Sequence, residues 1–106
     1  MSDFATNMAR VRREQIRWFL LLALNVARPA GAYSEVLLSV VQATYADATR
    51  LEIHRELDYL EERELVHIHR DPTDRWSCEL TRHGVDIVEY TVDVEPGIAR
   101  PKHPGG

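Results

Sequence analysis

Cysteine, lysine and long apolar runs are all scarce in this chain of 106 residues. A single cysteine, Cys78, excludes an internal disulfide and any zinc site built from several cysteines. The longest apolar run, residues 18–24, has seven residues, far fewer than the roughly 20 that a membrane-spanning helix needs. We therefore expect a soluble, cytoplasmic protein that makes no contact with membranes.

Arginine supplies nearly all the positive charge, because Lys102 is the only lysine among 13 basic residues. The formal net charge is −4, which by itself disfavours a nucleic-acid partner. The charge is unevenly distributed: residues 1–50 carry six arginines and four acids, whereas residues 51–106 carry seven basic groups and thirteen acids. A basic cluster at residues 10–17 therefore precedes an acidic cluster at residues 52–64.

Hydrophobic residues make up 44% of the chain, which is enough for a folded core, and the length fits a single domain. Residues 8–27 carry apolar side chains at helical spacing. The stripe consists of Ile16, Phe19, Leu20, Ala23 and Leu24. Because residues 18–24 are apolar on more than one face, we expect this helix to be central or to form a dimer. Residues 28–31 end it, since Pro29 cannot continue a helix.

Two further helices are expected in the middle of the chain. Ser34 is a plausible N-cap for the second helix, which should end near Tyr45. Thr49 begins the third helix, since Thr49 and Glu52 have the spacing of a capping box. The core-facing stripe of the third helix consists of Ile53, Leu57 and Leu60. Leu51 points away from that stripe, which suggests contact with a partner.

The hydrophobic period then changes from helical to alternating. Residues 65–70 include β-branched Val66 and Ile68 and predict a strand. Residues 71–74 have the composition of a turn, and residues 75–80 predict the returning strand. Together these segments predict a β-hairpin.

The end of the chain divides into a short helix and a tail. Thr81 is placed to cap a last helix that extends to about Tyr90. Proline and glycine are frequent from Glu95 onward, so we expect an extended and poorly ordered tail. The sequence therefore predicts one domain over residues 1–91 and a Pro/Gly-rich tail over residues 92–106.

Two short motifs accompany the predicted order of three helices, two strands and a helix. Residues 60–66, with the sequence LEERELV, resemble the LEEKGLV stretch that joins the recognition helix to the wing in bacterial winged-helix repressors. Residues 80–84, LTRHG, resemble the LTxxG motif that follows their second wing strand. Over roughly residues 12–90 the chain thus resembles winged helix-turn-helix transcriptional regulators. The resemblance implies a mainly α-helical α+β fold with a wing at about residues 65–80.

One position departs from this family's pattern. Glu64 stands where the family usually has a glycine before the hydrophobic pair. That glycine normally supplies the left-handed residue that ends the helix. Glu64 therefore implies a strained helix end or a turn that closes differently.

The whole layout also resembles small winged-helix proteins of Mu-like phages and prophages, and residues 96–101, PGIARP, belong to this likeness. The resemblance implies a phage-type transcriptional regulator or DNA-handling factor in the bacterial cytoplasm. Its partner would be double-stranded DNA, and it would act as a homodimer. The first and last helices are the expected dimer surface.

In winged-helix proteins that bind DNA, the third helix enters the major groove and the wing contacts the backbone. Carried over by position, the candidate DNA-binding residues are Thr49, Arg50, His54, Arg55, Arg70 and Arg75. Auxiliary phosphate contacts are expected from Arg12, Arg13 and Arg17. Arginine suits both roles, because its guanidinium reads guanine bidentately or holds a phosphate.

The charge of the third helix supports an alternative. Residues 50–64 contain three arginines and six acids, and acids subtract from phosphate binding. The alternative is a protein–protein interaction module in phage assembly or packaging that binds no DNA and has a phage or host protein as partner. Leu51 and Tyr59, which we expect to be exposed on this acidic helix, favour it.

Histidines offer the only hint of a metal site. His67 and His69 share one face of a strand, and with His54 or His83 nearby they could ligate a metal. We favour a polar outer face of the hairpin, because no metal-binding motif accompanies them. No serine or carboxylate pair has a catalytic context either. We therefore expect no metal, no cofactor and no enzymatic activity.

Overall fold

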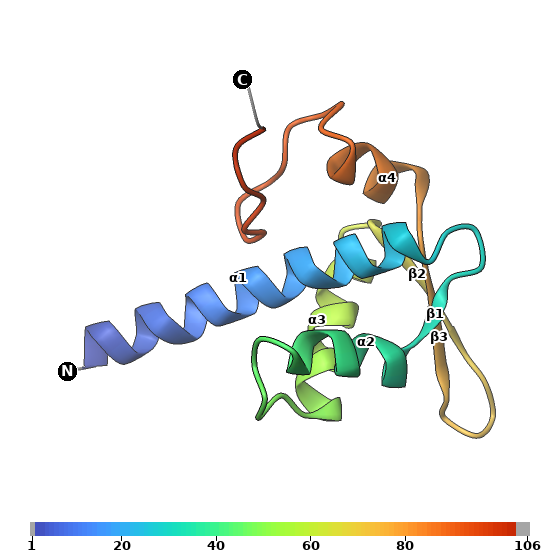
Figure 1. Cartoon of the computed structure of the whole chain (residues 1–106), viewed down its shortest axis with the longest axis horizontal. Coiled ribbons are helices and arrows are strands. Elements are labelled where there is room, and N and C mark those ends of the chain that lie inside the picture. The colour runs from blue at the N-terminus through green and yellow to red at the C-terminus, as the bar shows by residue number, and fades with distance from the viewer. Residues whose placement is uncertain (1, 104–106) are drawn as a thin grey trace.

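The computed structural model describes residues 2–103. Over these residues the chain is a mixed α+β protein with four helices and one small antiparallel sheet of three strands (Figure 1). In chain order the elements are α1 (Ser2–Val26), β1 (Ala32–Tyr33), α2 (Ser34–Gln42), α3 (Arg50–Glu62), β2 (Val66–Arg70), β3 (Trp76–Leu80) and α4 (Arg82–Val88). The predicted α+β class is confirmed, but the predicted order lacks one strand.

Helix α1 runs the length of the molecule, and its two halves have different surroundings. Its C-terminal half buries Ile16, Leu20 and Leu24 completely. Its N-terminal half projects past α2 and α3 (Figure 1) and leaves Phe4 and Met8 exposed. The helix starts well before the predicted residue 8, and an acidic residue in its first turn favours this start electrostatically.

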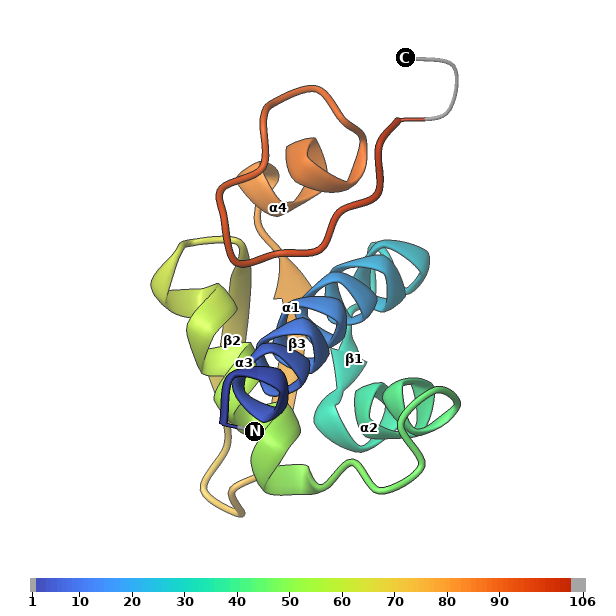
Figure 2. The ribbon, with the colours of Figure 1, turned by 90° about the vertical axis from the view of Figure 1, so that its left-hand side faces the viewer.

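The core lies where α1, α2 and α3 meet one another and the sheet. Viewed along α1, α2 and α3 lie on either side of it and α4 lies on the far side from them (Figure 2). The fully buried side chains include Leu21, Leu37, Val41, Ile53, Leu57, Leu60 and Cys78. The predicted core-facing stripe of the third helix is therefore confirmed.

Strand β1 is the element that the sequence did not predict. With two residues it is too short to show alternation. It pairs antiparallel with β3, Ala32 opposite Cys78 and Tyr33 opposite Ser77, so β3 is the central strand. Gly31 precedes it with φ of 77°, and a Cβ there would lie 2.5 Å from the Cys78 carbonyl oxygen. Only glycine lets the chain enter this edge of the sheet.

Two of the predicted helix caps are confirmed. Thr49 Oγ1 accepts a hydrogen bond from the Glu52 N–H at 3.2 Å, and Thr81 Oγ1 accepts one from the Gly84 N–H at 3.0 Å. The carboxylate of Glu52 accepts from Arg12 instead of turning back to the start of its own helix. The expected capping box is therefore half formed, and its acid serves the contact between α1 and α3.

The third predicted cap, Ser34, is wrong. Tyr33, already extended as part of β1, takes the N-cap position, and Ser34 is the first helical residue. The Ser34 hydroxyl lies 3.1 Å from His54 Nε2. The helix also ends at Gln42, earlier than the predicted Tyr45.

Helix α3 ends with the left-handed residue that a glycine normally supplies, although Glu64 occupies this position. Glu64 is left-handed, with φ of 62°. The Leu65 N–H donates to the Leu60 carbonyl and the Glu64 N–H to the Glu61 carbonyl, each at 2.9 Å. These two bonds define a Schellman motif, which normally places glycine at the left-handed residue. The expectation of a strained helix end is confirmed.

Gly84 is a second position that requires glycine, because the backbone of Leu65 lies very close to it. A Cβ on Gly84 would lie 2.1 Å from the Leu65 carbonyl oxygen. The same carbonyl accepts the Thr81 N–H at 3.1 Å, so the start of α4 packs directly on the backbone between α3 and β2. This contact gives the glycine of the LTRHG segment its physical reason.

The tail is extended, as expected, but it packs onto the domain. Ile98 is 7% exposed, the Ala99 N–H donates to the Glu14 carbonyl at 3.1 Å, and Arg17 Nη1 donates to the Gly97 carbonyl at 2.9 Å. The expected poor order is therefore wrong for residues 95–103. The remainder of the predicted tail, residues 104–106, lies outside the described residues, as does Met1.

Candidate nucleic-acid interface

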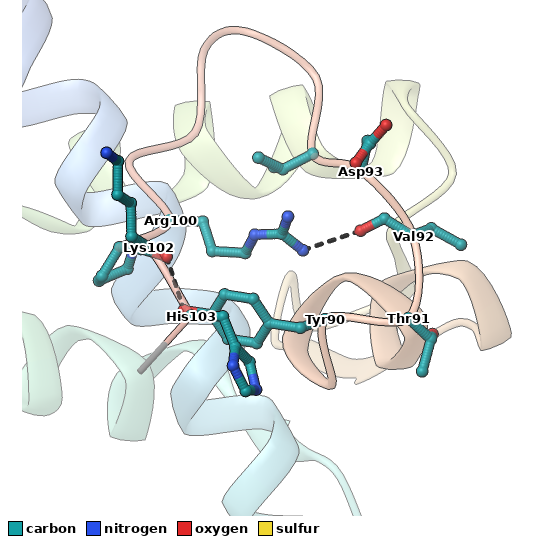
Figure 3. A pocket seen from close by; sticks show the side chains of 9 residues that line it. Tyr90, Thr91, Val92, Asp93, Arg100, Lys102 and His103 are labelled. Atoms are coloured by element: carbon teal, nitrogen blue, oxygen red, sulfur yellow. Dashed lines mark hydrogen bonds between the residues drawn. The ribbon is translucent and has the colours of Figure 1, made fainter. Parts of the chain in front are cut away.

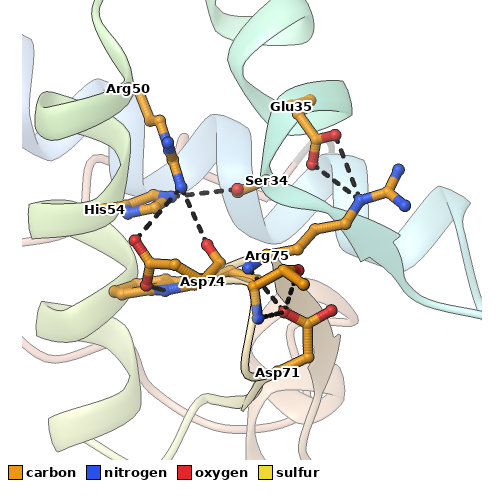
Figure 4. Close-up of polar contacts among 9 residues, drawn as sticks. Ser34, Glu35, Arg50, His54, Asp71, Asp74 and Arg75 are labelled. Carbon is orange, nitrogen blue, oxygen red and sulfur yellow. Dashed lines mark hydrogen bonds and ion pairs between the residues drawn. The ribbon is translucent and has the colours of Figure 1, made fainter.

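The first turn of α3 lies against the tip of the β2–β3 hairpin (Figure 4). Arg50 Nη2 donates to the Asp74 carbonyl oxygen at 2.9 Å and lies 3.5 Å from Asp74 Oδ2. Both side chains are mostly exposed. The two segments that sequence reasoning assigned to DNA, the start of the third helix and the hairpin turn, are therefore joined into one edge.

The hairpin turn is held by Asp71. Its Oδ1 accepts hydrogen bonds from the Thr73 hydroxyl at 2.6 Å and from the Thr73 and Arg75 backbone N–H groups, each at 2.9 Å. The Thr73 hydroxyl and the Arg75 N–H are the main causes that hold the pKa of the Asp71 carboxyl below its usual value. Arg75 then lies over the Tyr33 ring at 3.6 Å, with its Nε 3.3 Å from Glu35 Oε2.

His54 packs inside this edge rather than projecting from it. Its ring is stacked on Trp76, with centroids 3.8 Å apart and planes 9° apart, and its Nε2 faces the Ser34 hydroxyl (Figure 4). Burial lowers the pKa of His54, and the positive charge of Arg50 lowers it further. A neutral, stacked imidazole supports the hairpin against α3 and is poorly placed to reach a base.

Arg70 is held between two acids of α3. Its Nη2 lies 2.7 Å from Asp58 Oδ1 and 3.1 Å from Glu61 Oε1. The guanidinium carbon lies 4.3 Å from the centroid of the Trp76 ring. The hydrogen bond to Glu61, more than any other cause, raises the pKa of Arg70. A phosphate would have to displace these carboxylates to bind here.

Two of the predicted auxiliary residues hold α1 to α3. Arg12 forms ion pairs with Glu52 at 2.8 Å and Asp47 at 2.9 Å, and the bond to Glu52 is the main cause that raises its pKa. Arg17 pairs with Glu56 at 2.7 Å, and both side chains are nearly buried. Their positive charges are neutralised within the domain.

The other predicted residues face solvent. Thr49, Arg13 and Arg55 are all exposed. Among the ion pairs of residues 2–103, neither Arg13 nor Arg55 takes part, and the same holds for Arg10. Arg55 is therefore the predicted base-reading arginine whose charge is free.

Sequence reasoning missed the acids and the aromatic ring that fix this edge. Asp74 and Glu35 pair with Arg50 and Arg75, and Trp76 receives both His54 and Arg70. The acidic charge of α3 was visible in the sequence, but its pairing with the hairpin was not, since the partners are far apart in the chain. Trp76 is buried at the start of β3, on the same face of the strand as buried Cys78.

The histidines do not assemble a metal site in the described part of the chain. The His67 and His69 rings are 4.4 Å apart on β2, and His69 Nε2 lies 3.4 Å from Glu79 Oε1. His54 is instead stacked on Trp76. Within residues 2–103 no group of three or more histidine, cysteine or acidic side chains is arranged to hold a metal ion.

A polar cavity of about 660 Å³ lies between the end of α4 and the tail (Figure 3). Arg100 reaches into it over the Tyr90 ring and donates through Nη1 to the Ile87 and Val92 carbonyls at 3.0 and 2.9 Å. Tyr90 donates to the Pro101 carbonyl at 2.8 Å. These bonds close the tail onto α4, so the cavity's main cation already has partners.

The second concavity is an apolar groove between α1 and α2, with a volume of about 490 Å³. Its α1 wall carries Phe19, Leu22, Ala23, Val26 and Ala27, and its other wall carries Ala32, Val36, Leu37, Val40 and Thr44. It contains no charged residue, in contrast to the edge formed by α3 and the hairpin.

Comparisons with known proteins identify no family for this chain. No protein-family model matches the chain, and no curated protein matches its sequence significantly. In residues 2–103, no helix combines the length and the apolar character needed to span a membrane. The interpretation of the interface therefore depends on its own residues.

Proposed function

We propose that this protein is a winged-helix protein of the phage type that binds duplex DNA through the edge formed by α3 and the β2–β3 hairpin. The observation that carries the proposal is the contact of Arg50 with Asp74, which joins the first turn of α3 to the hairpin tip. In winged-helix proteins these two segments meet the major groove and the backbone. The pairing of β1 with β3 and the hairpin after α3 also support this assignment.

The paired arginines reduce this affinity without abolishing it. Arg50, Arg70 and Arg75 form ion pairs that are largely exposed, and such pairs stabilise a protein by about 0–1 kcal/mol. A phosphate can replace a carboxylate at this low cost. Arg55 needs no exchange. We therefore expect modest affinity that depends on few phosphate contacts.

Fluorescence anisotropy with a labelled duplex tests the proposal across a salt series. If all four arginines of one copy engage phosphate, the logarithm of the binding constant falls with a slope of about −3.6 against the logarithm of salt concentration. The variant Arg50→Ala/Arg55→Ala should lower both affinity and slope. Arg28→Ala/Arg82→Ala removes the same charge from exposed sites elsewhere and should change both much less. Equal losses in the two variants, or no salt-sensitive binding at low salt, would overturn the proposal.

A second candidate is a protein-interaction module in phage assembly or packaging, with a phage or host protein as partner. It is favoured by the surface of α3 itself, where Leu51 is 61% exposed in the first turn and the acidic residues Asp58, Glu61 and Glu62 follow toward the other end of the helix. A helix that carries several acids and an exposed apolar side chain suits a basic protein better than DNA. Under this second proposal Leu51→Ser should abolish capture of a phage protein. Under the first it should leave the salt dependence of DNA binding unchanged, because it removes no charge.

A further inference from the structure

An apolar stripe runs along α1. It is exposed toward both ends of the helix and partly covered in the middle, where the Tyr45 hydroxyl donates to Gln15 Oε1 and the Tyr45 ring lies beside Phe19. Five of the nine large hydrophobic residues exposed in the described chain lie on this one helix: Phe4, Met8, Val11, Leu22 and Val26. At about 100° per residue they fall within roughly 60° of one another, and half-buried Phe19 and Gln15 continue the same line. Monomeric proteins rarely leave this much apolar surface exposed on one helix.

The stripe is symmetric about Gln15. Phe4 and Val26 lie eleven positions on either side of it, Met8 and Leu22 seven, and Val11 and Phe19 four. Two copies of α1 that pack antiparallel around a two-fold axis at Gln15 would therefore bring each of these residues opposite its counterpart. Such a self-complementary arrangement is what a two-fold dimer requires. Because spacings of three and four residues are symmetric in any regular helical stripe, the choice of a second copy also depends on the fit between the projecting half of α1 and the apolar groove.

The two halves of α1 also differ in shape in a complementary way. The N-terminal half projects with Phe4, Met8 and Val11 on its surface (Figure 1). The C-terminal half forms one wall of the apolar groove, and Val36 and Val40 of α2 form part of the other. In the antiparallel pair each projecting half lies along the groove of the other copy, with anchors at the helical spacing of i, i+4 and i+7.

The charges of α1 permit this approach. Arg10, Arg13 and Arg17 lie roughly 140–160° around the helix from the centre of the stripe, so they face away from the second copy. Arg12 lies nearer but is neutralised by Glu52 and Asp47. The paired surfaces would therefore bring no like charges together.

We propose that a second copy of this chain occupies the stripe and the groove, with the two α1 helices antiparallel and crossing at Gln15. The last helix, which the sequence suggested as part of a dimer surface, has little to offer, because Ile87 and Val88 are buried within the monomer. Helix α2 takes its place. The inference is independent of DNA binding, since the α3–hairpin edge and this surface share no residue.

Sedimentation velocity or light scattering of the full chain should give twice the monomer mass of 12.2 kDa. Phe4→Glu/Val26→Glu places charges at the two ends of the stripe, at side chains that are 70% and 86% exposed and so are not needed for folding. It should raise the dissociation constant by about 100-fold or more, because each interface would bury unpaired carboxylates. Leu51→Glu changes an exposed apolar position on α3, outside the stripe, and as the control should stay dimeric.

Oxidative cross-linking then tests the register. Gln15→Cys should cross-link to itself, whereas Met8→Cys alone should not, because its two copies would lie about 21 Å apart along the helices. Met8→Cys/Leu22→Cys should restore cross-linking. The native thiol of Cys78 will not interfere, because burial raises its pKa to about 12. A monomer at high concentration, a heteromeric complex as the sole assembly, or self-linking by Met8→Cys alone would overturn the proposal.

Discussion

The imidazole of His54 lies flat on the indole of Trp76, with ring centroids 3.8 Å apart, and this stack joins the middle of α3 to the start of β3. The Ser34 hydroxyl bonds the same imidazole from α2. One side chain thus links three elements beside the proposed DNA-binding edge. Its protonation state therefore affects how firmly the hairpin is held.

Protonation of His54 should destabilise the fold. Burial, then Arg50, lower its folded pKa below the ordinary value of 6.5, while Asp74 and Asp58 oppose them. Between the folded pKa and about 6.5 the unfolded chain binds more protons, so the free energy of unfolding rises with pH in that window and levels off above it. We expect His54→Gln to remove this component.

The measurement is urea unfolding of both proteins from pH 5 to pH 8. The difference in free energy of unfolding between the native protein and His54→Gln should increase with pH up to about 6.5 and then stay constant. Comparison of the two proteins cancels the contribution of the other histidines. A difference that does not change with pH would contradict the assignment.

Glu64→Gly should stabilise the protein. Glu64 has φ of 62° at the Schellman position, and a left-handed conformation costs a side-chain residue about 1 kcal/mol that glycine avoids. The melting temperature should rise by about 4–8 °C. Arg55→Gly, in the middle of the same helix, is the control and should lower stability by about 0.8 kcal/mol. A decrease in both variants would show that the left-handed backbone stores no strain.

Removal of one partner from the Arg17–Glu56 ion pair should strongly destabilise the fold. The two side chains are 11% and 6% exposed and their atoms are 2.7 Å apart. Arg17→Met leaves a buried carboxylate without its cation, which costs about 3–5 kcal/mol. Arg17→Met/Glu56→Met should recover much of that loss, because it removes both charges. Urea unfolding of the three proteins measures these changes. A double variant less stable than Arg17→Met would show that the unpaired carboxylate is not the cause of the loss.

Gly84→Ala should disrupt the junction between α4 and the end of α3. The added Cβ would lie 2.1 Å from the Leu65 carbonyl oxygen, which belongs to backbone and cannot simply rotate away. We expect a loss of about 1–3 kcal/mol or more. His83→Ala changes the exposed neighbouring residue and should cost little. Thermal unfolding compares the two variants. Similar melting temperatures would show that the backbone at this junction shifts to accommodate the added methyl group at little cost.

Ile98→Ala tests whether the tail contributes to the fold. Ile98 belongs to the buried core, and truncation of a buried isoleucine costs about 2–5 kcal/mol. Lys102→Ala, at an exposed position of the same tail, should be neutral. Equal stability of the two variants, measured by urea unfolding, would place the tail outside the cooperative unit.

Features that depend on neighbouring residues in the chain were predictable from the sequence. The caps at Thr49 and Thr81, the buried stripe of the third helix and the turn at residues 71–74 each have a local signature. Strand β1 has none, because a two-residue strand exists only through its pairing with β3. Ser34 was misassigned for the same reason, since β1 places Tyr33 at the helix start.

The segments that form the candidate site were predictable from the sequence, but the ion pairing of their arginines was not. The resemblance to winged-helix proteins brought the first turn of the third helix and the hairpin turn together, but the ion pairs of Arg12, Arg17 and Arg70 join residues that are nine or more positions apart. Charge totals show that acids and arginines are both present. They do not show which acid meets which arginine, and that pairing decides how much positive charge is left for a phosphate.

The hydrogen bond from Arg17 to the Gly97 carbonyl joins residues that are 80 positions apart. Bringing such distant residues together costs loop-closure entropy, which contacts between near neighbours in the chain largely avoid. We therefore expect the helices to pair first and the segment around Gly97 to dock late in folding, when it completes the partners of Arg17.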